Sequence, residues 1–506
     1  MSNLDRTKRN IATSIISQII IIALGLIIPR LTMVGYGSEV NGLLSSITQF
    51  IAYLLLLEAG IQAVATQSLY KTVGNGDNKG TNEILSAVNK SYKKIGFYYL
   101  LALIVLSLVY PFFAKCQTVN YISVVLIVFF SGLGNVIAFF LQGKYKMLLT
   151  VEGKSYLLTT VNTTISILSH VVKIVMLILK LDVVLIIIAT FIDSCIQVVV
   201  IWLYIKKNYK WIDLSEKPNF SALNQNKHAL IHQISSLVFT NTDVLLLTIF
   251  CDLKIVSVYT IYKFVISNIT SFAIIPLDSC NFALGQMYNT SKDKFCKSID
   301  TLEVYYSGLV FTLFTIVLYL YLPFVKLYTK GVEDINYVDF YIALLFVLQE
   351  ILTFARYPML RVISYAGHFK QTLSRTIIET IINLVVSIIM VLNFGIYGVL
   401  IGTIVALLYR TIDIIVYSNK KLLNRSPNKT ISIYLVNLVL TAICSLILFS
   451  INVTINSYLT FIVVGFLSTL SVFIVFMIVL SVLYNKEFKN MFSLIKSFLY
   501  KKKKNI

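Results

Sequence analysis

The segment Leu26–Leu43 reads LIIPRLTMVGYGSEVNGL and joins the end of one long apolar run to the start of the next. The first run starts near Ile11, so Arg30 lies about 19 residues into it, or roughly 28 Å along an α-helix. That length nearly crosses the hydrocarbon core of a bilayer. An arginine is costly at this depth, and we therefore interpret Arg30 as a functional residue.

The composition is that of a membrane protein with many crossings. The chain has 506 residues, of which 57% are hydrophobic and 13% are charged, and its mean hydropathy is +0.82. Apolar runs of about 20 residues recur along its whole length, and no hydrophilic segment is long enough for a separate soluble domain. The net charge of +20 lies in short segments between the runs, which argues against a nucleic-acid partner. The six cysteines lack metal-ligand spacing and are interpreted as reduced packing residues.

Fourteen runs are long enough to cross a bilayer, so we predict an all-α polytopic membrane protein. The predicted spans cover residues 11–33, 41–68, 92–114, 119–142, 156–179, 182–205, 228–250, 255–285, 300–323, 338–361, 369–392, 396–418, 430–451 and 457–484.

The charges between the spans predict the orientation. The segments on the side of the two termini hold 32 Lys and Arg, whereas those on the opposite side hold five. Basic loops stay in the cytoplasm, so both termini are predicted to be cytoplasmic. After Lys486, apolar residues recur at helical spacing before four lysines, which predicts an interfacial helix that anchors the basic tail, residues 485–506.

The chain repeats at an offset of about 213 residues. Tyr145, Met147 and Leu148 match Tyr357, Met359 and Leu360 at 212, and residues 37–43 fall opposite 253–259 at 216. Six spans fit in one repeat, so both halves have the same orientation, a layout that some transporters use. We predict a six-helix bundle at 1–205, a cytoplasmic linker at 206–227, a second six-helix bundle at 228–418, and two additional helices at 430–484.

Two polar stripes fall at equivalent places in the repeat. The fifth and eleventh spans carry Thr159, Asn162, Thr163, Ser166, His170 and Lys173, and Thr372, Arg375, Thr376, Glu379, Asn383 and Ser387. Such stripes are costly against lipid and are expected to face an interior, wet cavity, although dry helix packing is the alternative. Weaker stripes occur in the first span (Asn10, Thr13, Ser14, Ser17, Gln18) and the seventh (His228, His232, Ser235, Ser236, Asp243).

Basic residues inside the spans suggest an anionic substrate. Arg375 can pair with Glu379 and Arg410 with Asp413 on their own helices, and Arg356 can extend to the inner surface. The other three, Arg30, Lys173 and Lys263, have no acidic residue three or four positions away. Together they suggest a cavity with positive patches that suits a diphosphate headgroup.

Acidic residues inside the spans are candidates for coupling to H⁺ or Na⁺. We select Glu58, Asp193, Asp243 and Glu350, while noting that each can equally serve to balance a cation. His170, His228 and His232 could relay protons, or could simply be hydrogen-bonded.

The sequence carries no enzymatic motif. Gly153-Lys154-Ser155 imitates the end of a phosphate-binding loop, but Leu148 stands where that loop requires glycine. No metalloprotease, nucleophile-elbow or dinucleotide motif is present, so we expect neither an enzyme nor a bound cofactor or metal.

The N-terminal pattern resembles the polysaccharide transporter family of the multidrug/oligosaccharidyl-lipid/polysaccharide (MOP) exporter superfamily. The residues that carry the resemblance are Asn10, Ser17-Gln18, Pro29-Arg30, Gly35 to Leu43, Glu58-Ala59-Gly60 and Leu69-Tyr70-Lys71. The fourteen spans, the short outer loops and the repeat match that superfamily along the whole chain.

The resemblance implies a flippase of a bacterial plasma membrane. Such proteins move an undecaprenyl-diphosphate-linked oligosaccharide to the outer leaflet for O-antigen, capsule or teichoic acid assembly, beside other polysaccharide-assembly proteins. It further implies that Arg30 lies in the substrate cavity, and similarity to lipid II flippases suggests that the last two helices guide the lipid tail. The alternatives are a drug/cation antiporter of the same superfamily and a membrane-embedded polymerase or acyltransferase.

Overall fold

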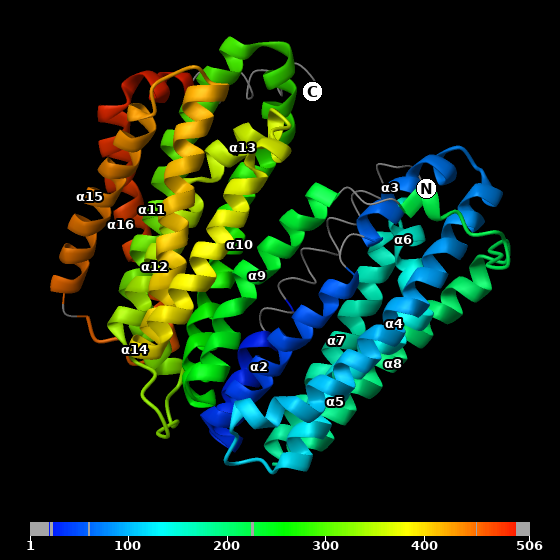
Figure 1. Ribbon diagram of the computed structural model, residues 1–506. Coiled ribbons are helices and arrows are strands. Elements are labelled where there is room, and N and C mark those ends of the chain that lie inside the picture. Colours follow the sequence, from blue (N-terminus) through cyan, green and yellow to red (C-terminus); the bar gives the residue numbers. More distant parts are fainter. Residues whose placement is uncertain (1–19, 21–23, 59–60, 224–226, 452, 492–506) are drawn as a thin grey trace. The chain divides into compact units, whose positions relative to one another are not determined.

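The computed structural model describes residues 20, 24–58, 61–223, 227–451 and 453–491, and the regular structure in these residues is helical (Figure 1). The predicted amphipathic tail beyond Met491, the stripe on the first span, and the side chains of His228 and His232 lie outside the described residues. A short apolar helix, Leu24–Tyr36, precedes the labelled elements.

The labelled helices of the N-terminal part are α2 (Ser38–Leu54), α3 (Ile61–Gly74), α4 (Asn78–Ala114), α5 (Tyr121–Leu141), α6 (Gly143–Val151), α7 (Ser155–Ile178), α8 (Val183–Asn208) and α9 (Lys227–Phe250). Those of the C-terminal part are α10 (Leu253–Thr290), α11 (Lys292–Tyr328), α12 (Phe340–Ala355), α13 (Tyr357–Tyr365), α14 (Phe369–Tyr417), α15 (Asn428–Ser450) and α16 (Tyr458–Leu483). Short 3₁₀ or π turns lie at Leu55–Glu58, Phe220–Leu223 and Ser418–Leu422.

The predicted all-α polytopic architecture is confirmed. Eleven helices in the described residues are long and apolar enough to cross a membrane. Of two shorter apolar helices, Leu24–Tyr36 overlaps the first predicted span and extends three residues beyond its end at 33, and Ile234–Phe250 lies within the seventh. The helix α14 covers two predicted spans, 369–392 and 396–418. Gly395, which adopts a left-handed φ of 52°, breaks the helix between them. Two predicted spans are instead divided: the second changes to a 3₁₀ turn at Leu55–Glu58, and the tenth ends at Ala355 before α13.

The chain falls into two compact units. Unit 1 comprises residues 1–260 and 331–335, and unit 2 comprises 261–330 and 336–506. By its contacts α9 belongs to unit 1, where Ser46 Oγ lies 2.6 Å from Thr248 Oγ1 and Tyr53 Oη lies 2.6 Å from Thr242 Oγ1. The predicted bundle boundary at residue 228 is defined by the sequence repeat rather than by contacts, and it stays a prediction.

Hydrogen bonds in unit 1 join segments that the loop charges assign to the same, outer side. The Tyr36 hydroxyl donates to the carbonyl of Leu181 at 2.5 Å. The carboxylate of Glu39 accepts from the backbone N–H groups of Gln117 and Thr118, at 2.7 and 2.9 Å. These bonds fix the start of α2 to the turn between α4 and α5, and they agree with the predicted arrangement of loops.

The predicted linker begins as a segment fixed to unit 1. Asn82 Nδ2 donates to the carbonyl of Trp211 at 3.1 Å, and Ser68 Oγ donates to that of Ala222 at 2.7 Å. Trp211 also packs against the apolar core of α3, α4 and α6. The linker therefore follows the ends of α3 and α4 as far as the last described residue before α9, Leu223.

Gly42 permits a close approach of α2 to the first turn of α10. A Cβ atom at Gly42 would lie 1.7 Å from the carbonyl oxygen of Leu253. Beside it, Asn41 Nδ2 donates to Ser257 Oγ at 2.7 Å, a bond between residues that are equivalent in the repeat.

We expect Gly42→Ala to lower the free energy of unfolding by about 1–3 kcal/mol, because backbone must move to admit the methyl group. Thermal unfolding of the purified protein in detergent measures this effect. Gly74→Ala is the matched control, since Gly74 ends α3 and a methyl group added there would meet no atom within 4 Å. Equal midpoints for the two variants would rule out the close approach.

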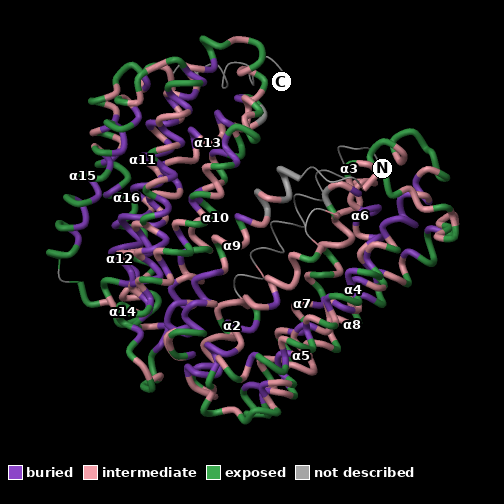
Figure 2. Tube along the Cα trace, in the orientation of Figure 1, coloured by how far each residue is buried: buried purple, intermediate pink, exposed green. Residues whose placement is uncertain are grey.

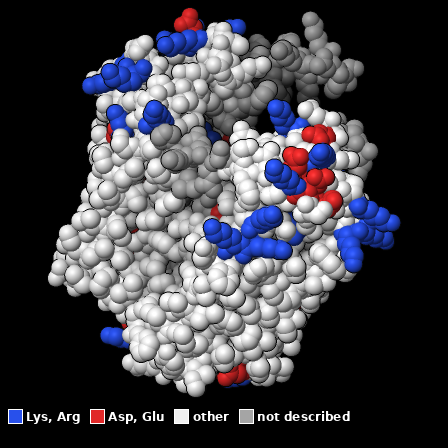
Figure 3. Space-filling model, turned by 45° about the vertical axis from the view of Figure 1, so that its right-hand side comes forward, with Lys and Arg blue, Asp and Glu red and all other residues white. Residues whose placement is uncertain are grey.

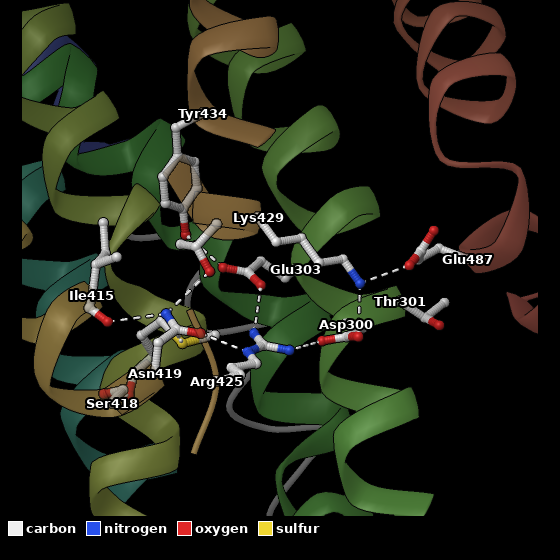
Figure 4. Close-up of polar contacts among 12 residues, drawn as sticks. Asp300, Thr301, Glu303, Ile415, Ser418, Asn419, Arg425, Lys429, Tyr434 and Glu487 are labelled. Atoms are coloured by element: carbon white, nitrogen blue, oxygen red, sulfur yellow. Dashed lines mark hydrogen bonds and ion pairs between the residues drawn. The ribbon is translucent and has the colours of Figure 1, made fainter. Parts of the chain in front are cut away.

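The last two helices are fixed to α11, the most buried long helix of unit 2. Of its most apolar window 72% is buried, and buried residues run along it in Figure 2. On its first turns, Asp300 and Glu303 face Arg425 and Lys429 at the start of α15 (Figure 4). Lys429 Nζ lies 2.7 Å from both Asp300 and Glu487, so this charge network also holds the segment that follows α16.

Removing Arg425 is expected to loosen α15 and α16. Glu303 is fully buried, and Arg425 Nη2 lies 3.3 Å from it. Arg425→Ala therefore loses charge-assisted bonds worth about 1.5–3 kcal/mol, and amide hydrogen exchange in α15 and α16 becomes faster. Lys420→Ala, which removes an exposed charge nearby, is expected to leave exchange unchanged. Equal exchange in both variants would show that the network does not hold these helices.

Candidate functional site

The polar and charged residues predicted to bind substrate lie in both units. In the face that Figure 3 shows, Lys and Arg are gathered in patches, with a broad uncharged surface between them. Charged side chains inside the helical segments are thus exceptions that need partners or a function.

Arg30 lies in the helix Leu24–Tyr36 of unit 1, and it is partly buried. The residues after it are fixed by the backbone: Gly37 has a left-handed φ of 88°, and Ser38 N donates to Asp334 Oδ2 at 2.9 Å. The resemblance motif around Gly37 and Ser38 therefore contains residues that serve the turn between the first two membrane helices.

The polar stripe of α7 faces α8 in part. Gln197 Nε2 donates to Asn162 Oδ1 at 2.5 Å, and His170 Nδ1 lies 2.6 Å from the carbonyl oxygen of Ser166 on its own helix. Lys173, near the end of the stripe, interacts electrostatically with Asp193 of α8. One carboxylate oxygen of Asp193 is buried with no hydrogen-bond partner among the described residues.

Two other predicted ion-coupling residues of unit 1 are held by tyrosines. The Tyr92 hydroxyl donates to Glu58 Oε1, and the Tyr259 hydroxyl donates to Asp243 Oδ2 at 2.7 Å. Asp243 is buried and Glu58 is partly buried.

Unit 2 contains a charge cluster of five residues, Arg356, Arg375, Glu379, Arg410 and Asp413. Glu379 receives Arg356 Nη1 at 2.6 Å and Arg410 Nε at 3.4 Å. Asp413 receives Arg410 Nη1 at 2.5 Å and Arg375 Nη1 at 2.6 Å. Three guanidinium groups thus share two carboxylates, which leaves the cluster with one net positive charge.

Further predicted residues surround this charge cluster. Glu350 interacts electrostatically with Lys263 and Arg356. Asn383, which is fully buried, donates to Thr403 Oγ1 at 2.9 Å, and its own carbonyl oxygen has no partner among the described residues. The structure therefore brings Glu350 and Lys263 close to the cluster through Arg356.

The repeat places different chemistry at equivalent positions. At an offset of 213, Asn162 corresponds to Arg375 and Gln197 to Arg410. In unit 1 these positions form an amide–amide hydrogen bond, whereas in unit 2 both bind Asp413. The same helix pair is therefore neutral in the first repeat and ionic in the second.

Several predicted pairings are corrected by the structure. Pairing of Arg410 with Asp413 on one helix is confirmed, but Arg375 binds Asp413 rather than Glu379. Arg356 does not extend to a surface, because its side chain is only 12% exposed and bonds Glu379. Lys173 and Lys263 have acidic neighbours on other helices, which sequence spacing cannot reveal.

Sequence reasoning also misses the network around Asp300 and Arg425, because Arg425 and Lys429 read as ordinary loop charges. Among the described residues no group of three or more His, Cys, Asp or Glu could hold a metal ion. All six cysteines are free. The candidate site thus consists of paired charges, amides and hydroxyls, which can bind anions and sugar hydroxyl groups through hydrogen bonds.

Comparison with solved structures gives matches over nearly the whole chain. The inward closed conformation of the lipid II flippase MurJ matches with a TM-score of 0.63 and 16% identity, over 94% of this chain and 99% of that one. An inward-facing multidrug resistance MATE family transporter of the MOP superfamily matches with a TM-score of 0.55 and 14% identity, over 87% and 99%. No family model and no curated protein sequence matches.

Proposed function

We propose that this chain, which has the fold of MOP superfamily transporters, is a flippase that moves undecaprenyl-diphosphate-linked oligosaccharide repeat units from the inner to the outer leaflet. The observation that carries the proposal is the match to a lipid II flippase over 94% of this chain and 99% of that protein. A substrate with a lipid tail, a diphosphate and sugars fits a membrane protein that is rich in internal cations and amides.

The basic residues support an anionic headgroup. Arg30 is a partly buried arginine in a membrane helix, and guanidinium groups bind phosphate oxygens in pairs. Lys173 and Lys263 add positive charge within the helical segments, and Asp193 and Glu350 act on these charges. The charge cluster of unit 2 adds one net positive charge.

In this mechanism the protein alternates between inward-open and outward-open states. Arg30 replaces water around the diphosphate, and Asn162, Ser166, His170 and Asn383 offer hydrogen bonds to sugars. Arg375, which binds Asp413, and Glu379, which binds Arg356 and Arg410, meet the substrate as members of the charge cluster. The lipid tail stays in the bilayer.

Coupling to H⁺ or Na⁺ is assigned first to Asp193. Its Oδ2 atom is buried without a hydrogen-bond partner among the described residues, and Lys173 lies close enough to respond to its charge. Glu58 and Asp243 are already bound by tyrosines, and Glu350 faces two cations. We place the protein in a bacterial plasma membrane with both termini cytoplasmic, beside other polysaccharide-assembly proteins.

A drug/cation antiporter is the second candidate, and the match to a MATE transporter favours it. That match covers 87% of this chain, against 94% for the lipid II flippase, and has the lower TM-score. The excess of basic over acidic side chains in the charge cluster also suits an anionic substrate better than a cationic drug. A polymerase or acyltransferase has no support from these matches.

A deletion strain of the source organism tests the proposal. The amount and sidedness of lipid-linked oligosaccharides are measured together with surface glycan. The proposal expects surface glycan to be lost while complete lipid-linked units accumulate on the cytoplasmic face. Unchanged lipid-linked units with altered drug sensitivity would favour the antiporter, and single units on the outer face would favour a polymerase.

A further inference from the structure

A buried lysine lies at the start of α6, on a segment predicted to face the cytoplasm. Lys144 is 8% exposed, and its Nζ atom donates to Asn89 Oδ1 at 2.6 Å. The same Nζ lies 5.0 Å from the centre of the Tyr145 ring. Neither partner carries a negative charge, so the ammonium group is buried without a balancing anion from them.

The charged neighbours of Lys144 add to this imbalance. Lys93 of α4 lies close enough to repel its charge. Lys146, two residues further along, interacts with Glu58, which the Tyr92 hydroxyl also binds. Among the described residues no carboxylate oxygen lies within 4.0 Å of Lys144 Nζ. A buried ammonium group usually has such a partner, because burial of an unpaired charge is costly.

In the second repeat, the buried cation at the position equivalent to Lys144 has a carboxylate partner. At the offset of 212 that relates Tyr145 to Tyr357, Lys144 corresponds to Arg356. Arg356 is also largely buried, and Glu379 binds it at 2.6 Å. The residue equivalent to Glu379 in the first repeat is Ser166, at the offset of 213. The first repeat therefore keeps the buried cation but lacks the carboxylate.

The start of α6 offers a second unsatisfied donor. Gln142 directly precedes α6 and is 1% exposed, and its Nε2 atom has no hydrogen-bond partner among the described residues. The helix that begins at Gly143 has nine residues, and its first N–H groups receive no side-chain cap. The N–H of Tyr145 already donates to the carbonyl of Gln142 at 2.9 Å, so the first N–H groups of α6 relevant to an anion are those of Gly143 and Lys144. N–H groups at a helix start favour an anion. Amide, ammonium and backbone donors thus occur within three consecutive residues, 142–144.

We propose that Gln142 and Lys144, with Lys93 beside them, form a binding site for a phosphate-class anion at the predicted cytoplasmic end of unit 1. The anion is the phosphate of an inner-leaflet lipid headgroup or a soluble phosphate or diphosphate group. Its charge balances Lys144, and its oxygens accept from Gln142 Nε2 and the first N–H groups of α6. The site is separate from Arg30 and does not depend on the proposed transport activity.

The pKa of Lys144 agrees with an absent counter-ion. Burial, together with the charge of Lys93, lowers the pKa of its ammonium group to about 8. A bound anion would favour the protonated form and offset this effect.

The test is binding to the purified full-length protein with inorganic diphosphate as the soluble probe. In parallel, the protein is placed in phosphatidylcholine bilayers with and without phosphatidylglycerol. We expect one of the two anions to raise the thermal unfolding midpoint. Lys144→Met is expected to weaken the apparent Kd about tenfold, the loss of one charge-assisted hydrogen bond. Lys206→Met, which removes an exposed lysine of the same unit, serves as the control and should change Kd less than about twofold.

Each outcome decides one question. Stabilisation by diphosphate identifies a soluble phosphate group, and stabilisation by phosphatidylglycerol alone identifies a lipid headgroup. No stabilisation by either, or the same Kd in the Lys144→Met variant, overturns the proposal. If Lys144→Met does not fold, Lys93→Gln tests the same site, because Lys93 is exposed, and it should weaken binding about two- to fivefold. None of these results depends on whether the protein flips lipids.

Discussion

Glu379→Gln is expected to lower the free energy of unfolding by about 3–5 kcal/mol, because the substitution leaves buried guanidinium groups without their shared carboxylate. Glu379 binds Arg356 at 2.6 Å and Arg410 at 3.4 Å, and the side chains of these arginines are only 12% and 5% exposed. The substitution raises the net charge of the cluster from one to two. Thermal unfolding in detergent measures the loss.

Two further variants separate charge imbalance from loss of shape. In Glu379→Gln with Arg356→Met, one positive charge is removed together with its partner, so most of the stability should return. Glu333→Gln removes an exposed carboxylate and should change the free energy of unfolding by less than about 0.5 kcal/mol. A double variant as unstable as Glu379→Gln alone would show that the cluster is not held by charge balance.

Arg30→Ala is expected to abolish most transport while the protein still reaches the membrane. In the proposed mechanism its guanidinium group binds the diphosphate through two parallel hydrogen bonds, and loss of about 3 kcal/mol corresponds to roughly a hundredfold lower rate. Arg30→Lys keeps the charge but not the paired geometry, so it should retain intermediate activity. Lipid-linked oligosaccharide on each leaflet is measured in complemented deletion strains.

The matched control for Arg30 is Lys326→Ala, which removes an exposed positive charge at the end of α11. It should support normal surface glycan. If Arg30→Ala also supports normal surface glycan at equal protein levels, then Arg30 has no role in binding substrate.

The sequence predicts the architecture well because its signals are long. Apolar runs and loop charges need no knowledge of distant contacts, and even the break in α14 at Gly395 is predicted, since residues 393–395 separate two runs. The repeat is also visible, and the structure forms a nine-residue helix at both matching segments, α6 and α13.

Contacts between distant helices cannot be predicted in the same way. Arg410 and Asp413 are three residues apart and meet as expected, but Arg356 meets Glu379 across 23 residues. Spacing rules describe neighbours on one helix only. Lys173 and Lys263 therefore look more isolated in the sequence than they are in the structure.

The linker is hard to predict for the same reason. Residues 206–227 read as a polar connection between bundles, yet Trp211 packs into the apolar core of unit 1. Its partners, the ends of α3 and α4, lie more than 100 residues earlier in the chain, as the Asn82–Trp211 bond shows. Composition alone cannot identify such a docking segment.

The most direct test of the central claim is flipping in reconstituted vesicles. Purified protein is placed in liposomes that contain a fluorescent polyprenyl-diphosphate-linked saccharide, and the fraction accessible from outside is followed with time under an imposed pH or Na⁺ gradient. The proposed function predicts movement between leaflets that is faster than in empty liposomes and is lost with Arg30→Ala. Movement no faster than in empty liposomes under either gradient, together with uptake of a cationic drug by the same vesicles, would contradict it.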